Sequence, residues 1–205
     1  MSVQHQQLDA SELGPDPFLA FEKWFAAASD TDIADPNAMS LATSANNEVS
    51  VRTVLMKYWD TKGFVFFTNY ESRKAEQIAA NPFVGLLFYW ECLRRQVRIE
   101  GAATRISAAE SLKYFATRPR GSQLGAWCSA QSSVISSRDV LNAKLEEMKR
   151  KFSNRQVPLP SMWGGYRVVP RRIEFWQQGQ DRLHDRFLFE RPDGDAVWSL
   201  NRLAP

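Results

Sequence analysis

Residues 39–69, MSLATSANNEVSVRTVLMKYWDTKGFVFFTN, hold three strand-like segments separated only by short turns. Apolar and polar side chains alternate over residues 39–43 and again over residues 49–56, which is typical of strands that bury one face. Ala45-Asn46-Asn47 and Asp60-Thr61-Lys62-Gly63 supply turn-forming residues between the segments. Because no long helix separates the three strands, we expect them to pair antiparallel.

The strand pattern continues beyond this stretch. Further strand-like segments are residues 84–90, 95–106, 166–176, 182–190 and 196–203, the last two joined across Asp193-Gly194. Helix starts are marked by Asp16-Pro17, by Ser72, by the capping box Ser107-x-x-Glu110 and by Ser136 with Asp139. The sequence therefore predicts a mainly β fold with surrounding helices. We expect a single domain over residues 16–205, preceded by a polar and mobile segment at residues 1–15.

Composition excludes several classes of protein. The 205 residues carry 26 Lys and Arg against 23 Asp and Glu, and the net charge of +3 is too small for a nucleic-acid-binding surface. Two cysteines make no disulfide framework, and the longest apolar run, residues 84–90, is too short to cross a bilayer. Without a signal pattern, we expect a cytoplasmic protein with no nucleic-acid or membrane partner. CxxC, HExxH, GxGxxG and GxxxxGK are all absent, so no usual metal site is expected.

Residues 181–187 place cationic or titratable side chains at every second position. A strand here would project Arg182, His184 and Arg186 from one face and turn Leu183 and Phe187 toward the core. Such a face suits an anion. An ordinary solvated strand face is the alternative, and at this point both interpretations stay open.

Two further groups of donors lie near predicted helix ends. Arg73 and Lys74 open the helix at Ser72, where the backbone N–H groups and the helix dipole would join them around an anion. Two solvated surface cations are the alternative. Tyr114 and Arg118 share a helix face, and Ser122 in the following loop would complete a phosphate pocket, unless this is an exposed helix end. With 12% aromatic residues, these groups suit a flat, phosphorylated redox cofactor and a phosphorylated substrate.

Eight ordered segments carry a family resemblance: Arg52-Thr53-Val54-Leu55-Met56-Lys57, Phe67-Thr68-Asn69-Tyr70-Glu71-Ser72-Arg73-Lys74, Arg95-Gln96-Val97, Tyr114-Phe115-Ala116-Thr117-Arg118-Pro119-Arg120-Gly121-Ser122, Gln131-Ser132-Ser133, Trp163-Gly164-Gly165-Tyr166-Arg167, Ile173-Glu174-Phe175-Trp176 and Arg182-Leu183-His184-Asp185-Arg186. From about residue 16 to residue 205 the chain resembles the pyridoxine (pyridoxamine) 5′-phosphate oxidases. The resemblance implies an FMN-binding split β-barrel, an antiparallel Greek-key barrel, that forms a homodimer with FMN at the interface. It also implies an FMN-dependent oxidoreductase that converts pyridoxine or pyridoxamine 5′-phosphate to pyridoxal 5′-phosphate, with O2 as acceptor and H2O2 as product.

The resemblance also assigns roles by position. It implies FMN binding by Arg52, Lys57, Phe67, Thr68, Arg73, Lys74, Gln96, Gln131, Ser132, Trp176 and Arg186. It implies substrate binding by Lys57, Tyr114, Arg118, Ser122, Arg182 and His184, of which Arg182 and His184 are the catalytic pair that holds the ring against the flavin. Arg52 and Lys57 are five apart, so a regular strand would put them on opposite faces. For both to serve neighbouring ligands, as the resemblance implies, the strand needs a bulge or a twist between them. Phe67 stands where the family often has tyrosine.

The N-terminus departs from the family pattern. Family members often carry an Arg-x-x-Tyr motif before the first helix, and residues 1–15 contain neither arginine nor tyrosine. This departure favours an alternative function: a phenazine-biosynthesis FMN oxidase that acts on dihydrophenazine carboxylic acids, a tricyclic substrate. The phosphate-pocket residues favour the vitamin phosphate instead. A third interpretation is a flavin- or haem-binding split barrel without turnover, against which the Arg182 and His184 pair argues.

Overall fold

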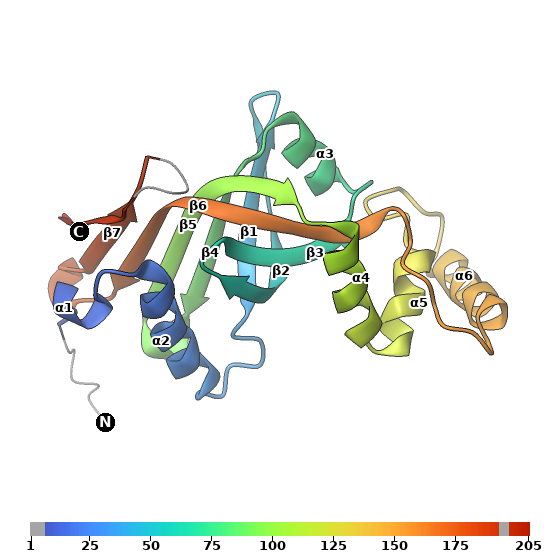
Figure 1. Ribbon diagram of the computed structural model, residues 1–205, viewed down its shortest axis with the longest axis horizontal. Helices are drawn as coiled ribbons and strands as arrows, with labels where there is room; N and C mark the ends of the chain where they lie inside the picture. The colour runs from blue at the N-terminus through green and yellow to red at the C-terminus, as the bar shows by residue number, and fades with distance from the viewer. Residues whose placement is uncertain (1–6, 193–196) are drawn as a thin grey trace.

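The computed structural model describes residues 7–192 and 197–205, and Figure 1 shows their arrangement. The strands are β1 (Ala38–Ala45), β2 (Glu48–Asp60), β3 (Gly63–Asn69), β4 (Phe83–Trp90), β5 (Arg95–Arg105), β6 (Trp163–Gln177), β7 (Asp185–Glu190) and β8 (Ser199–Leu203). The helices are α1 (Ala10–Leu13), α2 (Pro17–Ser29), α3 (Arg73–Ala80), α4 (Ala108–Thr117), α5 (Arg120–Cys128) and α6 (Arg138–Lys151), with the 3-10 turns η1 (Glu91–Leu93) and η2 (Gln180–Arg182). None of the helices in these ranges is long and apolar enough to cross a membrane. The predicted turn at Asp193-Gly194 lies outside the described residues.

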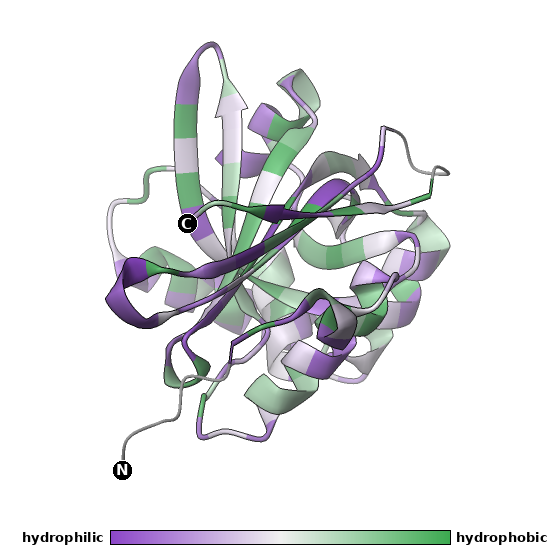
Figure 2. Ribbon diagram, turned by 90° about the vertical axis from the view of Figure 1, so that its left-hand side faces the viewer, coloured by the Kyte–Doolittle hydropathy of each residue, from purple (hydrophilic) through white to green (hydrophobic). Residues whose placement is uncertain are grey.

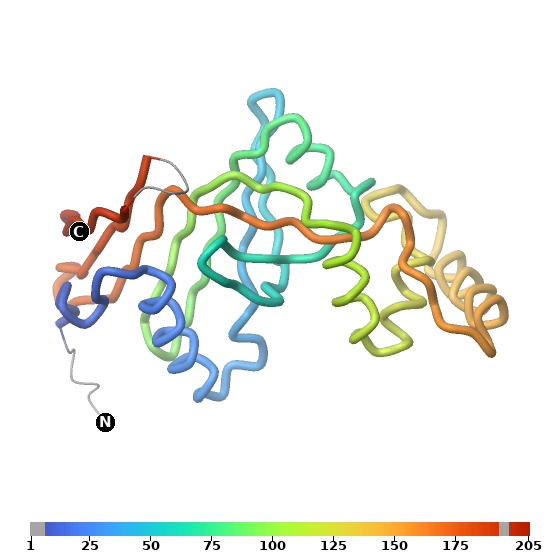
Figure 3. The backbone as a smooth tube through the Cα atoms, viewed as in Figure 1, coloured from blue at the N-terminus to red at the C-terminus, as the bar shows by residue number. Residues whose placement is uncertain are grey.

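A closed, six-stranded antiparallel barrel forms the centre of the described chain, and Figure 3 traces its path. The strands follow the order β3-β2-β1-β4-β5-β6, and β3 pairs with β6 to close the barrel. Strands β7 and β8 continue the sheet beyond β6. Strands β1, β2 and β3 are connected in sequence, and β4 returns to lie beside β1. The resulting order β4-β1-β2-β3 is a Greek key. The predicted mainly β fold, with antiparallel strands in a split Greek-key barrel, is confirmed.

Strand β6 has 15 residues and changes partner halfway along its length. Residues 163–168 pair with β3, whereas residues 172–177 pair with β7. Strand β5 pairs with both halves of β6, and the register of this pairing shifts once, next to Gly101. A Cβ on Gly101 would lie 2.1 Å from the Val169 carbonyl oxygen, so the close approach of the two backbones requires glycine. This bulge lets one strand belong both to the barrel and to the C-terminal extension.

Helix α2 packs against the barrel and supplies an aromatic centre to its core. The Asp16 side chain caps the helix and Pro17 occupies its first turn, as predicted. Phe21 is fully buried, with ring centroids 4.9 Å from Phe64 and 5.2 Å from Phe88 in edge-on contacts. Such contacts stabilise aromatic cores beyond the area they bury. Figure 2 shows apolar and polar residues alternating along the strands, as one buried face requires.

A second buried cluster holds helices α4, α5 and α6 against the start of β6, at the other end of the molecule from α1 (Figure 1). It consists of Phe115, Leu124, Met148, Phe152, Val157 and Trp163. Helix α6 contributes Met148, Phe152 follows directly after its last residue, and Leu145 packs at the edge of the cluster. This cluster fixes the position of α4 and α5 relative to the barrel.

The strand predicted over residues 182–190 begins only at Asp185. Before it, the 3-10 turn η2 includes Arg182 with a left-handed φ of 64°. The Gly179 N–H donates to Nδ1 of His184 at 3.2 Å, and a Cβ on Gly179 would lie 1.8 Å from the Leu183 carbonyl oxygen. The chain therefore turns tightly here. The predicted common strand face is wrong for Arg182 and His184, and Leu183 is 71% exposed instead of anchored in the core.

Three details at helix ends also differ from the predictions. Ser122 lies in helix α5, not in a loop. Helix α6 is capped by Ser137 instead of Ser136. The Ser107 hydroxyl accepts from the Glu110 N–H as expected, but the Glu110 carboxylate turns to two neighbouring strands and does not complete the capping box.

Residues 7–15 of the segment expected to be mobile pack against the rest of the chain. Leu8 and Leu13 are 1% and 2% exposed, as buried as the barrel core. The Leu8 N–H donates to Asp185 Oδ2 at 2.9 Å, and Arg202 donates to the Leu8 carbonyl at 3.2 Å. The sequence gives no sign of this packing, because two leucines among polar residues form no period. Residues 1–6 lie outside the described residues.

We expect Leu8→Ala to lower the free energy of unfolding by about 2–5 kcal/mol, the usual cost of a leucine-to-alanine cavity in a core. Leu19→Ala in α2 is the matched control, because Leu19 is 55% exposed and should change stability by less than about 1 kcal/mol. Urea denaturation of both variants measures the difference. Equal effects would mean that the segment around Leu8 does not pack in this way.

Candidate functional site

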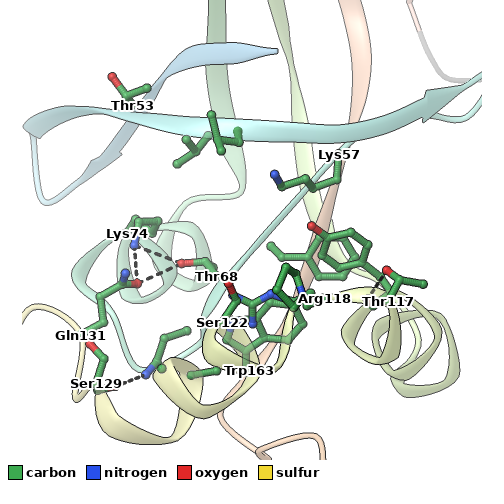
Figure 4. Close-up of a pocket in the computed structure, with 18 residues that line it drawn as sticks. Thr53, Lys57, Thr68, Lys74, Thr117, Arg118, Ser122, Ser129, Gln131 and Trp163 are labelled. Carbon is green, nitrogen blue, oxygen red and sulfur yellow. Dashed lines mark hydrogen bonds between the residues drawn. The ribbon is translucent and has the colours of Figure 1, made fainter. Parts of the chain in front are cut away.

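A cavity of about 760 Å³ opens between β2, β3, α4 and α5 (Figure 4). Eight residues predicted as cofactor or substrate ligands line it: Lys57, Phe67, Thr68, Lys74, Tyr114, Arg118, Ser122 and Gln131. Its openness to the outside and its mixed polar and aromatic walls suit a flat polar ligand. The close-up shows Lys57 reaching in from the strand side, opposite Arg118 and Ser122, while Lys74 lies to one side with Thr68 and Gln131.

Lys57 reaches the cavity because β2 bulges at this residue. The register with β3 passes from Met56 paired with Phe66 directly to Tyr58 paired with Val65, so Lys57 is the extra residue. Of the bulge or twist expected between Arg52 and Lys57, the strand has a bulge, and it lies at Lys57 itself. Burial, and secondarily the charge of Arg118, hold the pKa of the Lys57 ammonium below its usual value.

Lys74 is a buried ammonium group held by neutral oxygens. Its Nζ donates to Thr68 Oγ1 at 3.0 Å, to Ser72 Oγ at 3.1 Å and to Gln131 Oε1 at 2.8 Å. Burial, with a smaller contribution from the Arg52 charge, lowers the pKa of Lys74 to about 8. Ser72 stands at the predicted N-cap position of α3, but its hydroxyl donates back to the Asn69 carbonyl instead of capping the helix.

Arg52 and Arg73 lie beside this cluster without lining the cavity. Arg52 donates to Thr43 Oγ1 at 2.5 Å and to Gln77 Oε1 at 3.2 Å. Burial and then the neighbouring Arg73 lower the pKa of the Arg52 guanidinium. The Arg73 N–H donates to Ser132 Oγ at 3.3 Å, which joins the start of α3 to the loop that carries Gln131 and Ser132. Thr43 and Gln77 were not predicted, because nothing in their spacing marks them as holding an arginine.

A stack of three aromatic rings forms one wall of the cavity. The Phe67 ring lies 4.0 Å from Tyr114 and 5.1 Å from Trp163, nearly parallel to both. The Arg118 guanidinium lies 4.6 Å above the Trp163 ring, a cation–π contact, and its buried NH1 has no hydrogen-bond partner among the described residues. Trp163 belongs to the segment Trp163-Gly164-Gly165-Tyr166-Arg167, and the resemblance implies no ligand role for it. The Pro-rich connector before it gives no periodicity that would have marked it as a cavity residue.

The cavity and its margin therefore hold four cations, Arg52, Lys57, Lys74 and Arg118, none of which forms an ion pair within the described part of the chain. Cations that are partly buried without a counter-charge are costly unless an anion joins them. Lys74 and Arg52 lie on one side of the cavity, and Lys57 and Arg118 on the other. The arrangement can hold two separate anionic groups, with an aromatic surface on the side of Arg118.

The remaining predicted residues gather at the far end of β6. Gln96 pairs with Trp176 across β5 and β6, and Trp176 pairs with Arg186 across β6 and β7, so these three form one row. The His184 ring lies 4.7 Å from the Trp176 ring, and Arg182 lies in the adjacent turn η2. This second group is therefore assembled, although not on the strand face that the sequence predicted.

The two groups are far apart in one copy of the chain. Trp163 at the start of β6 lines the cavity, whereas Trp176 near its end belongs to the second group. At about 3.3 Å per residue, the strand between them spans up to about 40 Å, and Figure 1 shows β6 running along the molecule from α4 to β7. One copy does not bring Gln96, Trp176, Arg182, His184 and Arg186 to the cavity.

Residues 25–152 match the family model of pyridoxamine 5′-phosphate oxidase, and residues 163–205 match the pyridoxine 5′-phosphate oxidase C-terminal dimerisation region. The chain belongs to the pyridoxamine 5′-phosphate oxidase family. As a member of it, the chain is an oxidoreductase. Of the second group, Trp176, Arg182, His184 and Arg186 lie within the part that matches the dimerisation region, whereas Gln96 lies in the other matched part.

Several named proteins are similar to this chain over nearly its whole length. The pyridoxine/pyridoxamine 5′-phosphate oxidase of Crocosphaera subtropica is 62% identical over 97% of this chain and 94% of its own length. The protein of the same name from Rippkaea orientalis is 58% identical over 97% of this chain and 93% of its own length. The crystal structure of PhzG from Burkholderia lata 383 in complex with tetrahydrophenazine-1-carboxylic acid is 28% identical, with a TM-score of 0.91 and 100% coverage of both chains.

The buried environment of Lys74 predicts the pH at which its side chain titrates. Without ligand, we expect the Lys74 side chain to titrate near pH 8, because burial favours the neutral amine. Adding inorganic phosphate should raise the midpoint, since a bound anion favours the ammonium form. NMR of the lysine side chains measures both midpoints, and Lys74→Arg assigns the signal by its disappearance. A midpoint near the unperturbed 10.4 in the ligand-free protein would contradict the buried environment.

Proposed function

We propose that this protein is an FMN-dependent oxidase that converts pyridoxine or pyridoxamine 5′-phosphate to pyridoxal 5′-phosphate, with O2 as acceptor and H2O2 as product. The observation that carries the proposal is the cavity with cations on two sides and a flat aromatic wall. A phosphorylated cofactor and a phosphorylated substrate together use both sides. The names of relatives at 58–62% identity support this substrate class.

The side of the cavity around Lys74 fits the phosphate of FMN. Lys74, Arg52 and Arg73 supply positive charge next to the first turn of α3, and Thr68, Gln131 and Ser132 supply hydrogen-bonding groups. The Lys74 ammonium donates to Thr68, a neutral acceptor, and an anion would add an acceptor that carries the opposite charge. Phe67 lines the same wall and would pack beside the cofactor. Because Phe67 has no hydroxyl, its contribution would be apolar contact only.

The opposite side fits the phosphate of the substrate. Lys57 from the β2 bulge, Arg118 from the end of α4, Tyr114 and Ser122 offer four donors of three chemical kinds around one region. The unpartnered NH1 of Arg118 is the clearest sign of a missing acceptor, because buried guanidinium donors are otherwise paired. An arginine in this position can bind two phosphate oxygens at once.

The site would be completed by a second copy of the chain. The second group lies too far from the cavity of its own chain to touch the same flavin. Four of its members, Trp176, Arg182, His184 and Arg186, fall in the matched dimerisation region, and Gln96 pairs with Trp176 from β5. In a two-fold symmetric homodimer each copy contributes both groups, so two equivalent composite sites form. Arg182 and His184 would then be the catalytic pair that lies over the substrate ring.

Bound FMN would supply the hydride acceptor, and O2 would reoxidise it with release of H2O2. The protein residues have the remaining tasks. Lys57, Tyr114, Arg118 and Ser122 would hold the substrate by its phosphate, which fixes one end of the molecule. Arg182 and His184 would orient the pyridine ring at the other end, where a misplacement of about 1 Å can cost roughly a hundredfold in rate. We keep the cytoplasm as the predicted location.

A phenazine-biosynthesis oxidase remains the second candidate. It is favoured by the fit to the PhzG structure over the full length of both chains. The identity of 28% to that protein, against 58–62% to the vitamin phosphate oxidases, argues for the first function. The four donors on the substrate side also suit a phosphate better than a single carboxylate.

We expect the purified protein to be yellow and to release FMN, not FAD, on denaturation, because the Lys74 side of the cavity suits a terminal phosphate. Chromatography of the released flavin against both standards identifies it. The same preparation should oxidise pyridoxine 5′-phosphate faster than a dihydrophenazine carboxylic acid. A colourless protein that cannot be reconstituted with FMN would refute the cofactor, and oxidation of the tricycle alone would make the second candidate the function.

The composite site can be tested by mixing two inactive variants. Arg118→Ala damages the cavity and His184→Ala damages the second group, so neither homodimer has an intact site. After refolding together, half of the dimers should be hybrids with one intact site of two, which restores about a quarter of the unaltered activity. Arg118→Ala mixed with Ser122→Ala is the control, because both changes lie in the cavity group and no recovery is expected. Absence of recovery in the first mixture would place both groups in one copy.

A further inference from the structure

A small polar network lies directly behind the substrate side of the cavity. The Tyr58 hydroxyl donates to Glu110 Oε1 at 2.5 Å, and Arg167 NH2 donates to the same oxygen at 3.0 Å. Arg167 NH1 also pairs with Asp60 Oδ1 at 2.5 Å. Because these residues come from β2, α4 and β6, one carboxylate ties together three elements that are remote in sequence.

Each end of this network adjoins a residue of the proposed phosphate pocket. Tyr58 directly follows Lys57, the extra residue of the β2 bulge. Glu110 lies one helical turn before Tyr114 on the same face of α4, and Arg118 follows at the end of that helix. The network therefore connects the strand that carries Lys57 with the helix that carries Tyr114 and Arg118.

The geometry and environment make this connection stiff. The Arg167 side chain is only 14% exposed, and its guanidinium lies 5.8 Å from the Tyr58 ring centre. The carboxylate of Glu110 also lies in the first turn of α4, where negative charge is favourable. Burial, and then the bond to Glu110, raise the pKa of Tyr58 well above its usual range, so the phenol keeps its proton and remains a donor.

The pocket needs such a connection because its cations repel each other. Lys57 and Arg118 approach from opposite sides, and the charge of Arg118 contributes to the lowered pKa of Lys57. Without a bound anion, repulsion favours a wider separation of β2 and α4. A tie behind the pocket opposes that separation and keeps the two cations at a distance at which one phosphate can reach both.

We propose that Tyr58, Glu110 and Arg167 are positioning residues that hold the Lys57 bulge and helix α4 together and thereby set the affinity of the pocket for a phosphate group. The proposal rests on the proposed function, in which this pocket takes the substrate phosphate. None of the three residues lines the cavity, so they act through Lys57, Tyr114 and Arg118 and not by contact with the ligand.

The deciding variant is Tyr58→Phe, which removes one hydroxyl and keeps the ring and every charge. Glu110→Gln is the second variant and removes the charge with almost no change in shape. Glu146→Gln is the matched control, because Glu146 pairs with Lys149 at 2.7 Å on the exposed face of α6, away from the pocket. Inorganic phosphate is the binding probe, measured by calorimetry on the FMN-loaded protein.

We expect Tyr58→Phe and Glu110→Gln to weaken phosphate binding about threefold to tenfold, the effect of losing one or two hydrogen bonds that preorganise a site. KM for pyridoxine 5′-phosphate should rise by a similar factor, while kcat and flavin content stay within about twofold. The Glu146→Gln control should match the unaltered protein in all four quantities. A merely structural tie would instead lower flavin content and kcat together with phosphate affinity.

Two results would overturn the proposal: unchanged phosphate affinity in Tyr58→Phe, or a parallel loss of flavin, kcat and phosphate binding in both variants. Lack of phosphate binding by the unaltered protein would also overturn it. The proposed function fails by a different observation, which is absence of pyridoxine 5′-phosphate oxidation by the unaltered enzyme. Because phosphate binding is measured without turnover, the two failures can be told apart.

Discussion

The backbone pairing of β6 is the constraint on which the rest of the structure depends. One side of this strand hydrogen-bonds to β5 along nearly its whole length, while its other side serves β3 first and β7 afterwards. A strand of regular geometry would continue around the barrel. The bulge opposite Gly101 bends it out instead, so the barrel closes with β3 and the strand still has an edge for β7. The same bend separates the two groups of functional residues.

The cavity depends on a second irregularity and on an unusual balance of charge. The bulge at Lys57 turns one cation toward the cavity that Lys74 also lines, while Arg52 packs beside Lys74 against Thr43 and Gln77. Neutral oxygens hold Arg52 and Lys74 in place of carboxylates. A carboxylate partner for either cation would stabilise the ligand-free protein, but it would compete with an incoming anion. Hydroxyl and amide oxygens orient the cations and leave their charge for the ligand.

The sequence predicts the barrel well because alternation and turn residues depend on local chemistry. The roles that the resemblance implies for Arg52 and Lys57 also call for a bulge or a twist, and the structure has a bulge at Lys57. Prediction from the sequence fails where one local pattern is compatible with two different backbone structures. The alternation at Arg182 and His184 is the same in a strand and in the turn closed by Gly179, and only tertiary contacts decide. Burial of Leu8 likewise depends on Asp185 and Arg202, which are more than 170 residues away. Helix-end patterns alone single out Lys74, Tyr114, Arg118 and Ser122, which line the cavity, whereas Lys57, Thr68 and Gln131 were predicted only through the family resemblance.

Folding and ligand binding are linked through Lys74. Its pKa of about 8 in the fold lies below the 10.5 of the unfolded chain, so the fold binds this proton less tightly. The resulting cost to stability is fully present below about pH 8 and disappears as the pH rises above the unfolded value. An anion beside Lys74 reverses the sign of its environment, raises the pKa and removes the cost at neutral pH. At neutral pH, where this cost is present, a bound anion would therefore relieve it and would also stabilise the native state by mass action.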